Sequence, residues 1–361
     1  MKKTFISASV ASVLALASFG ALAEGPSFYG RLELAVTNTE TGATLQSGTN
    51  GVDANYADEN NAGTYLENNF SLLGVKGTEK IADGFEAIYQ MEFQVENTST
   101  TGDVFKARNT YLGLKTNVGT MLVGRNDTVF KQAEGNVDVF GNTNADIDRL
   151  VSAQTRSADG VWYYSPKIAD LVTLNATYLF DDNDTTAKTS ESLYALSATL
   201  GDSKFKEQNY YAAVAYNKGI AGVDAYRVVG QAKFGQFKLG GLFQQSEDVV
   251  NSDLDGNTYF VNVVYDLNGV NLKAEYGADE TGFGSYYKNV NTTGKVDGKP
   301  VITKGTDINV QNFNVGADYR LSKSTMVYGQ YAMYRGDHVV AGNKVDLQDD
   351  NVFSVGVRYD F

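Results

Sequence analysis

The 361-residue chain contains no cysteine and only one histidine, His338. The absence of cysteine excludes disulfide bridges and any zinc or iron–sulfur site held by thiolates. A single histidine leaves almost no room for a multi-histidine metal site or a histidine-based catalytic triad. His338 precedes two valines and no nucleophile motif accompanies it, so we expect a solvated loop residue.

Basic residues and long hydrophobic runs are also scarce. The 30 lysines and arginines are outnumbered by 43 aspartates and glutamates, which gives a formal net charge of -13. This balance argues against nucleic-acid binding, because a nucleic-acid binder needs a basic face that displaces counterions from phosphates. Mean hydropathy is -0.28, and no segment beyond the N-terminus approaches the ~20 apolar residues of a membrane helix. These averages are typical of an exported, soluble, acidic protein.

The N-terminus has the pattern of a secretory signal peptide. Two lysines precede an apolar stretch over residues 5–22, and the cleavage motif Ala21-Leu22-Ala23 is followed by Glu24. We predict a signal peptide over residues 1–23, cut between Ala23 and Glu24; an N-terminal membrane anchor is the weaker alternative. Loss of the two lysines changes the net charge from -13 to -15 for a single domain of residues 24–361.

Apolar and polar residues alternate through most of the remaining chain. In residues 270–276, Val270, Leu272 and Tyr276 share one face, and Lys273 and Glu275 lie on the other. Side chains alternate across a strand, so the pattern predicts β-strands with one apolar and one charged face. Sixteen such strands are expected, near residues 27–37, 65–77, 84–96, 106–116, 119–126, 156–165, 171–180, 191–200, 209–218, 224–234, 237–245, 256–267, 270–278, 310–321, 325–335 and 351–361.

The connections between these strands alternate in length. Long segments follow odd-numbered strands, at 38–64, 126–155, 279–309 and 336–350, whereas even-numbered strands end in short turns such as Gly235-Gln236. Strands of ~10 residues with long loops at one rim and short turns at the other are typical of an outer-membrane barrel. A soluble sandwich seldom has such one-sided loops, and a propeller would repeat a motif about every forty residues. We therefore predict an all-β, transmembrane, antiparallel up-and-down β-barrel.

Several motifs resemble the Gram-negative general porin family across the whole mature chain. They are residues 28–32 (FYGRL), 71–77 (SLLGVKG), 84–90 (GFEAIYQ), 108–115 (RNTYLGLK), 119–125 (GTMLVGR) and 161–166 (VWYYSP), with a last strand that ends in Tyr359 and Phe361. The resemblance implies a sixteen-stranded barrel, a homotrimer and an inward-folded third loop. It also implies that the terminal-Phe strand is the signal read by the outer-membrane assembly machinery.

The resemblance further implies a pore constriction. The third loop, about 126–155, carries the acidic candidates Asp127, Glu134, Asp138, Asp146 and Asp148. Facing them across the pore we expect Arg108 and Arg156, which match family positions, and the further candidates Arg31 and Arg125. Opposed charges give a transverse field that favours polar solutes. Alternatively, the carboxylates are solvated loop charges and the arginines form wall ion pairs with little effect on flux.

The sequence departs from the family where Leu72 and Trp162 replace common arginines. With fewer fixed cations and a charge of -15, we expect a pore that favours cations. The predicted function is a general diffusion porin in the outer membrane of a Gram-negative bacterium, passing small hydrophilic solutes and ions without a cofactor. A substrate-specific channel is the alternative, and an outer-membrane hydrolase is less favoured. Trp162, Tyr163 and Tyr164 are consecutive, so their rings alternate faces and form no single sugar track.

The expected partners follow from the same resemblance. They are the homotrimer, outer-membrane lipid and lipopolysaccharide, the assembly machinery, and permeating solutes and ions, but no nucleic acid. Trimer contacts are expected on the early strands, near residues 70–75, 111–114 and 121–123. Acidic clusters at 53–59, 181–184, 247–255 and 346–350 would suit divalent cations that bridge lipopolysaccharide phosphates, but solvated loops are favoured and no metal site is predicted.

Overall fold

The structure, a computed structural model, describes residues 25–46, 62–98, 102–180, 192–287, 292–296, 299–303 and 305–361. Eighteen strands join in one antiparallel sheet. β2 and β3 share one place in the wall and β19 is a short addition beside β18, which leaves sixteen wall strands. The predicted signal peptide, with Ala23 and Glu24, lies outside the described residues, and its cleavage stays a prediction.

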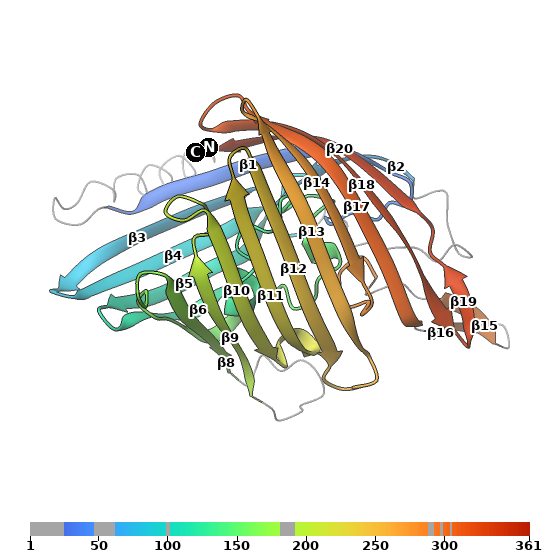
Figure 1. Cartoon of the computed structure of the whole chain (residues 1–361), viewed down its shortest axis with the longest axis horizontal. Coiled ribbons are helices and arrows are strands. Elements are labelled where there is room, and N and C mark those ends of the chain that lie inside the picture. The colour runs from blue at the N-terminus through green and yellow to red at the C-terminus, as the bar shows by residue number, and fades with distance from the viewer. Residues whose placement is uncertain are drawn as a thin grey trace, which may run out of the picture.

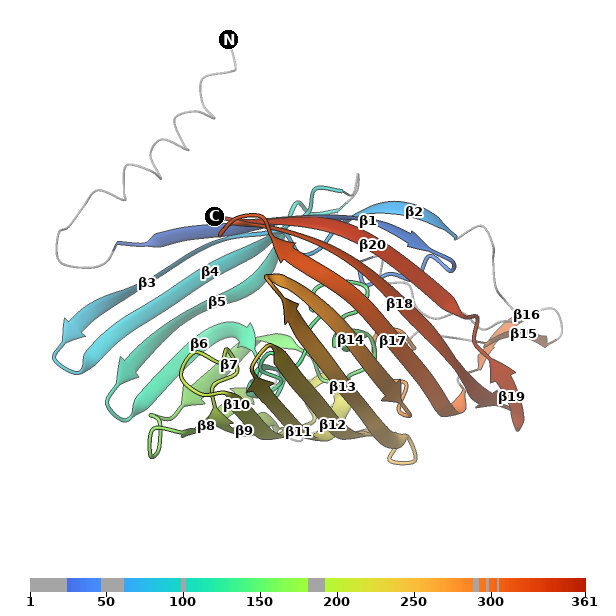
Figure 2. The ribbon, with the colours of Figure 1, turned by 45° about the horizontal axis from the view of Figure 1, so that its top comes forward.

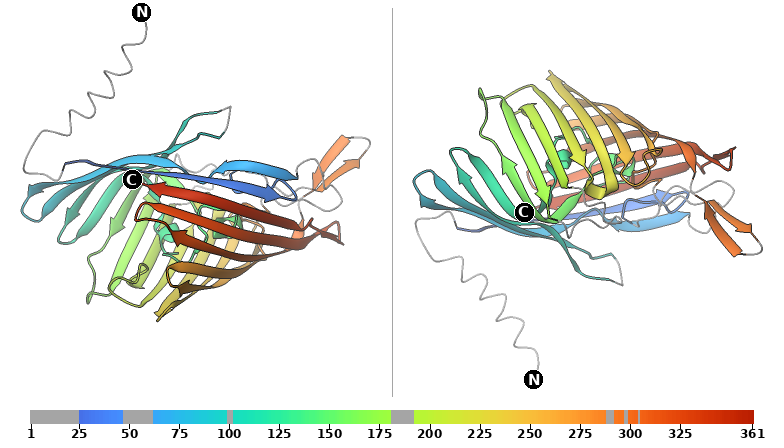
Figure 3. Two further views of the ribbon diagram at one scale, coloured as in Figure 1. Left: turned by 90° about the horizontal axis from the view of Figure 1, so that it is seen from above. Right: turned by 90° about the horizontal axis from the view of Figure 1, so that it is seen from below.

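The strands follow one another around the barrel in chain order (Figures 1 and 2). They are β1 Ser27–Thr39, β2 Gly63–Asn68, β3 Leu72–Ala82, β4 Phe85–Val95, β5 Phe105–Thr116, β6 Gly119–Asp127, β7 Arg156–Tyr164, β8 Val172–Leu179, β9 Leu193–Gly201, β10 Tyr210–Lys218, β11 Val223–Phe234, β12 Phe237–Asp248, β13 Asp255–Leu267, β14 Val270–Asp279, β17 Thr306–Arg320, β18 Thr325–Val340, β19 Asn343–Asp346 and β20 Asp350–Asp360. A separate hairpin, β15 Thr292–Val296 with β16 Lys299–Thr303, projects beyond the wall (Figure 3).

The last strand closes the barrel against the first, as the predicted barrel requires. Arg31 lies opposite Asp360 in the β1–β20 register. Gly30 and Phe361 then exchange two backbone hydrogen bonds, with N···O distances of 2.9 and 3.0 Å. The ring of Phe361 covers Gly30 so closely that a Cβ there would collide with it. Closure pairs the last strand of the wall with the first, which suits a bilayer because lipid offers no hydrogen bonds.

The alternation has the opposite sense to that of a soluble protein. On β1, Leu32 and Val36 are 47% and 53% exposed, whereas Glu33 and Thr37 are 3% and 0% exposed. The apolar residues face outward along the wall and the polar residues face the interior, as the register predicted. An apolar band of this extent needs lipid to cover it. No helix in the described part of the chain is long and apolar enough to cross a bilayer.

Two sequence predictions about strands are corrected by the structure. The single strand expected over residues 65–77 is interrupted between β2 and β3, where Phe70 has a φ of 58°. The last long loop is mostly a hairpin, because β18 continues to Val340 and pairs with β19. His338 is therefore not a solvated loop residue: it is fully buried on β18 and hydrogen-bonded to Tyr287.

Candidate functional site

The segment between β6 and β7, residues 128–155, lies inside the barrel (Figure 3). It contains two short helical turns, α2 Val129–Gln132 and η4 Ile147–Arg149, which the strand pattern did not predict. Thr128 caps α2 by accepting a 3.2 Å hydrogen bond from the Lys131 amide. Asp146 caps η4 in the same way. We call this segment the constriction loop. Its apolar side chains, among them Phe130 and Ile147, pack against inward-facing wall residues in one cluster.

One part of the wall holds the constriction loop by its backbone. Side chains from β10, β13, β14, β17 and β18 donate hydrogen bonds of 2.6–3.0 Å to its carbonyls: Tyr211 to Ala133, Asn262 to Val137, Lys273 to Val139, Asn314 to Ala145 and Tyr334 to Asn144. A segment with little helix or sheet of its own must find such partners for its buried carbonyls. We call these five residues, together with Arg227, the loop-binding wall.

Arg227 on β11 is the centre of the loop-binding wall. It is 1% exposed and donates to the loop carbonyls of Phe130 at 3.1 Å and Ser152 at 3.3 Å. It also donates to Gln154 at 2.9 Å and twice to Gln244 on β12, while its guanidinium covers the Phe130 ring at 4.1 Å. A planar guanidinium with five donors suits this arrangement of several acceptors. Sequence reasoning missed Arg227, and only its place in the polar register was a signal.

Arg149 fixes the far end of the constriction loop. Its guanidinium lies between two tyrosine rings, 5.1 Å from Tyr286 and 4.6 Å from Tyr334. It donates to the Ala43 carbonyl at 3.1 Å, which joins the constriction loop to the segment after β1. The residue is 1% exposed. Cation–π contacts are strongest when desolvated in this way, but no sequence pattern indicated this role.

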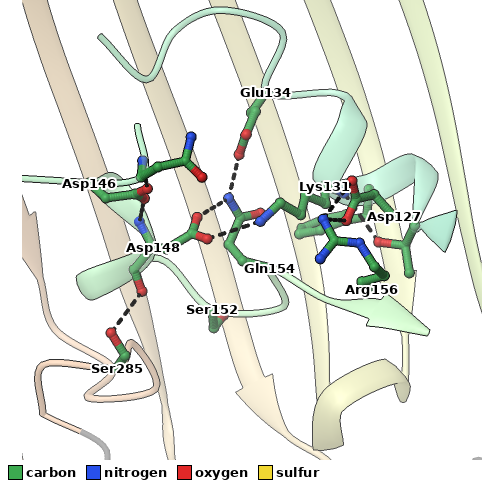
Figure 4. A network of polar contacts seen from close by, with 12 residues as sticks. Asp127, Lys131, Glu134, Asp146, Asp148, Ser152, Gln154, Arg156 and Ser285 are labelled. Atoms are coloured by element: carbon green, nitrogen blue, oxygen red, sulfur yellow. Dashed lines mark hydrogen bonds and ion pairs between the residues drawn. The ribbon is translucent and has the colours of Figure 1, made fainter. Parts of the chain in front are cut away.

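Glu134 and Asp148 form a polar network within the constriction loop (Figure 4). Gln154 donates to both carboxylates, and Lys131 pairs with Asp148 at 2.9 Å. Burial, with the nearby Asp148 charge, raises the pKa of Glu134 to about 7. Burial alone would lower the pKa of Lys131, but Asp148 and Glu134 outweigh it and raise that pKa. Most partners of these acidic candidates thus lie in their own loop, and Arg227 of wall strand β11 is 4.0 Å from Glu134.

Asp138 and Asp146 are the other two acidic loop candidates. Asp146 is 6% exposed and accepts hydrogen bonds from the backbone N–H groups of Asn142 and Asp148. Asp138 accepts one from Phe140 at 3.0 Å and lines a cavity beside the wall. Burial raises the pKa of both carboxyls well above their usual range. Asp146 therefore stabilises the conformation of the loop through these hydrogen bonds. Of these two carboxylates, only Asp138 borders the cavity.

Three of the predicted arginines form ion pairs with carboxylates of the wall itself. Arg108 pairs with Glu92 at 2.6 Å, and Arg31 pairs with Asp360 at 3.2 Å. Arg156 pairs at 3.1 Å with Asp127, so this predicted loop acid belongs to the end of β6 (Figure 4). We call Arg31, Arg108 and Arg156, with these partners, the ion-pair wall.

Arg125 differs from the other three arginines. It lies opposite Thr110 beside a register shift in β6, and its buried Nε has no hydrogen-bond partner among the described residues. The structure thus brings together the predicted charges mainly as local pairs, loop with loop and wall with wall.

The break between β2 and β3 brings the chain into the barrel next to the ion-pair wall. Ser71 is fully buried, and its hydroxyl accepts a 3.0 Å hydrogen bond from the Glu33 amide. Asn69 donates to the Tyr328 hydroxyl at 2.8 Å, which lies on β18. The Phe70 ring lies 5.9 Å from the Arg108 guanidinium. Extra residues of this kind re-aim side chains at barrel walls. We call residues 69–71 the wall bulge.

Trp162, the other departure from the family, has a packing role. It is fully buried under the constriction loop and donates from Nε1 to the Asp127 carbonyl at 3.0 Å. The position therefore anchors the start of the loop, where an arginine would have placed a charge in the lumen.

Comparison with known proteins agrees with this geometry. The chain matches the family model described as Gram-negative porin over residues 8–339. It is 24% identical to the major outer membrane protein P.IA of Neisseria meningitidis serogroup C, over 99% of both chains. Its fold is similar to that of an anion-selective porin from Comamonas acidovorans, with a TM-score of 0.66 at 19% identity over 93% of this chain and 99% of that one.

A second solved structure, OmpT of Vibrio cholerae in its trimer form, gives a TM-score of 0.62 at 19% identity, covering 93% of this chain and 99% of the other. These likenesses concern the fold, whereas the family model matches the sequence itself. The match spans nearly all of a closed barrel with an apolar outer face and a loop bound inside. The protein belongs to the Gram-negative porin family, whose members form pores in the outer membrane.

Proposed function

We propose that the protein is a general diffusion porin that passes small hydrophilic solutes and ions down their gradients. The observation that carries this proposal is the reversed alternation of the wall, which turns apolar side chains to lipid and polar side chains to the interior. An interior lined by charged and amide groups holds water, and the constriction loop limits the size of what passes. Passage of this kind needs no cofactor and no catalytic group.

Reconstitution tests the proposal directly. The protein is purified as a folded barrel and added to planar bilayers and to liposomes loaded with sugars of graded size. We expect stepwise ohmic conductance and swelling rates that fall smoothly with solute size. Saturation by one sugar would favour the substrate-specific channel, and the absence of conductance would overturn the proposal.

We propose that the pore favours cations. The predicted mature chain has a net charge of -15, and carboxylates of the ion-pair wall already offset Arg31, Arg108 and Arg156. The related porin from Comamonas acidovorans is described as anion-selective, so selectivity within this fold depends on the individual charges. A reversal potential measured across a KCl gradient tests the proposal. A clear preference for chloride would contradict it.

We propose a homotrimer formed through the outer face of the early strands. Leu73, Leu112, Met121 and Val123 are 43–60% exposed on β3, β5 and β6. The OmpT relative has been solved in a trimer form. The variant L112E should dissociate the assembly, as measured by native mass in detergent, while L272E on the far side of the barrel should not. Dissociation by both variants or by neither would contradict this interface.

Two further partners stay proposals on the sequence alone. We infer that the assembly machinery reads the terminal strand with Tyr359 and Phe361, two residues that are 47% and 57% exposed. Lipopolysaccharide would contact the long-loop rim. Outer-membrane yield of F361A, compared with F353A in the same strand, tests the first inference. Equal yields would contradict it.

A further inference from the structure

A cavity of about 210 Å³ lies on the side of the constriction loop that faces the short turns. It is bounded by Asn136 and Val139 of that loop, by the ends of β11, β12, β13, β14 and β17, and by the β9–β10 connection, residues 202–209. This connection contacts the constriction loop, because Asn136 donates to the Ser203 carbonyl at 2.7 Å. Since a water molecule occupies about 30 Å³ of the liquid, the cavity has room for a small anion with part of its hydration shell. We call it the lysine cavity.

Three lysines lie in or beside the lysine cavity. Lys204 of the β9–β10 connection and Lys238 of β12 line it. Lys233 on β11 lies directly opposite Lys238 in the strand register, and the alternation of β11 places it on the same inward face as Arg227. In the part of the chain that the structure describes, none of the three ammonium groups has an ion pair or a hydrogen bond. Like charges directly opposite each other destabilise a strand pair, so this arrangement suits an anion that binds near both.

The carboxylates in and beside the lysine cavity already have partners. Asp318, which lines it, pairs with Lys273 at 2.5 Å. In the β9–β10 connection, Glu207 pairs with Lys167 at 2.6 Å, and Asp202 accepts hydrogen bonds from the backbone N–H groups of residues 204, 206 and 207. The lysine cavity therefore differs from the ion-pair wall, where each arginine faces a carboxylate.

Gln231 on β11 adds a neutral donor to the same cavity. It is 8% exposed and lines the cavity. Its Oε1 accepts a 3.2 Å hydrogen bond from the backbone N–H of Asn136, whereas its Nε2 makes no hydrogen bond to the described residues. Neither this Nε2 nor the nitrogen of any of the three ammonium groups is closed off from solvent. A solute in the cavity can therefore reach donors and positive charge, and both suit an anion.

We propose that the lysine cavity is a weak binding subsite for small oxyanions of the phosphate class. The oxyanion binds between Lys204 and Lys238, Lys233 adds its charge from the next strand, and the Gln231 amide donates to one of the oxygens. A doubly charged anion gains more from these charges than chloride does. The effect is local, because salt screens it within about 10 Å at 0.1 M, so the pore as a whole keeps its preference for cations. The inference rests on the proposed diffusion channel and assigns it a solute class.

Single-channel recording with four matched solutes tests the subsite. They are inorganic phosphate, glycerol phosphate, the monovalent anion gluconate and neutral glycerol, each added to KCl at neutral pH. We expect a saturable reduction of the current by phosphate that weakens as the KCl concentration rises, an effect of gluconate at least about threefold weaker, and none with glycerol. Glycerol phosphate as potent as phosphate supports recognition of the phosphate group on a solute, and a stronger effect of phosphate supports the free ion. Phosphate no more potent than gluconate would overturn the proposal.

Variants separate this proposal from that of the channel itself. K204Q and K238Q should each weaken the effect of phosphate roughly three- to fivefold, as expected for partly exposed charges, and the double variant at least about tenfold. The matched control is K323Q in the β17–β18 turn, which removes the same charge from the same rim outside the cavity and should leave the effect unchanged. Circular dichroism and native mass establish that each variant is folded. If the wild type conducts ions but phosphate has no effect, the subsite is wrong; without conductance, the proposed function fails.

Discussion

The two walls inside this barrel use arginine in opposite ways. In the ion-pair wall, the side chains of Arg31, Arg108 and Arg156 are 14–20% exposed and each faces a carboxylate on a wall strand. In the loop-binding wall, the Arg227 side chain is 0% exposed and its hydrogen bonds end on backbone carbonyls and side-chain amides, with the Glu134 carboxylate of the constriction loop 4.0 Å away. Partly exposed pairs are weak and tuneable, whereas a buried charge is costly to leave unpaired.

This difference teaches which arginines act on solutes and which maintain the shape of the pore. A charge that keeps access to water also keeps its field in the lumen, so the ion-pair wall can influence permeating ions. A guanidinium that is fully covered by the constriction loop acts through the position of that loop. We therefore propose a permeation role for the arginines of the ion-pair wall and a structural role for Arg227.

The largest effect is expected from R227M. Loss of the guanidinium leaves the Phe130 and Ser152 carbonyls and the Gln244 side chain without their donor, and each buried group left unsatisfied costs about 1–3 kcal/mol. We expect the constriction loop to detach, with faster tryptic cleavage at Lys131 and a larger, noisier single-channel current. R156M in the ion-pair wall is the matched control. Protease resistance equal to that of the wild type would contradict the assignment of Arg227.

A smaller effect is expected from S71A in the wall bulge, beside the ion-pair wall. The substitution removes the hydroxyl that accepts a hydrogen bond from the buried backbone N–H of Glu33. Leaving that N–H without a partner costs about 1–3 kcal/mol of stability. Thermal unfolding in detergent measures the change. S157A, on β7 in a partly exposed position, serves as the control. An unchanged unfolding temperature would show that the bulge does not depend on this bond.

The third effect in order of size depends on pH and is expected in the constriction loop. The pKa of Glu134 is about 7 when folded, above its ordinary 4.5, so its contribution to stability is full below pH 4.5 and is lost as the pH rises through 7. Protection factors of residues 129–137, which divide out the base-catalysed intrinsic exchange rate, should therefore be higher at pH 5 than at pH 8. E134Q should flatten this profile. The same pH profile in E134Q and the wild type would exclude Glu134 as the titrating group.

The smallest effect is expected from R156Q in the ion-pair wall. The partly exposed pair with Asp127 contributes up to about 1 kcal/mol, so stability should hardly change. Removing the charge should shift the reversal potential in a KCl gradient toward greater cation preference, by no more than about twofold in permeability ratio. R320Q, at the short-turn rim, is the control for a general loss of charge. A shift toward chloride would break the distinction between the two walls.

The residues themselves explain how far the sequence could be interpreted. The alternation around Leu32 and Glu33 predicted both the strand and the face that each residue occupies, because a strand has a fixed period of two. The break at Phe70 has no such periodic signal, since asparagines such as Asn68 and Asn69 are also found in regular strands. Arg227 and Arg31 looked equivalent, because both occupy the polar register. The sequence predicts a loop at His338, because its pattern does not show that β18 continues past Gly336.

The sequence by itself determined the class of structure: a closed wall of about sixteen amphipathic strands, with the last pairing with the first. These properties follow from local periodicity and loop length, which are written along the chain. Only the tertiary structure decided what the charged residues do, because their partners are distant in sequence. Arg227 meets Phe130 from 97 positions away, and Tyr334 meets Asn144 from 190 positions away. Whether a charge faces water or a carbonyl depends on where the constriction loop rests, and no local pattern contains that information.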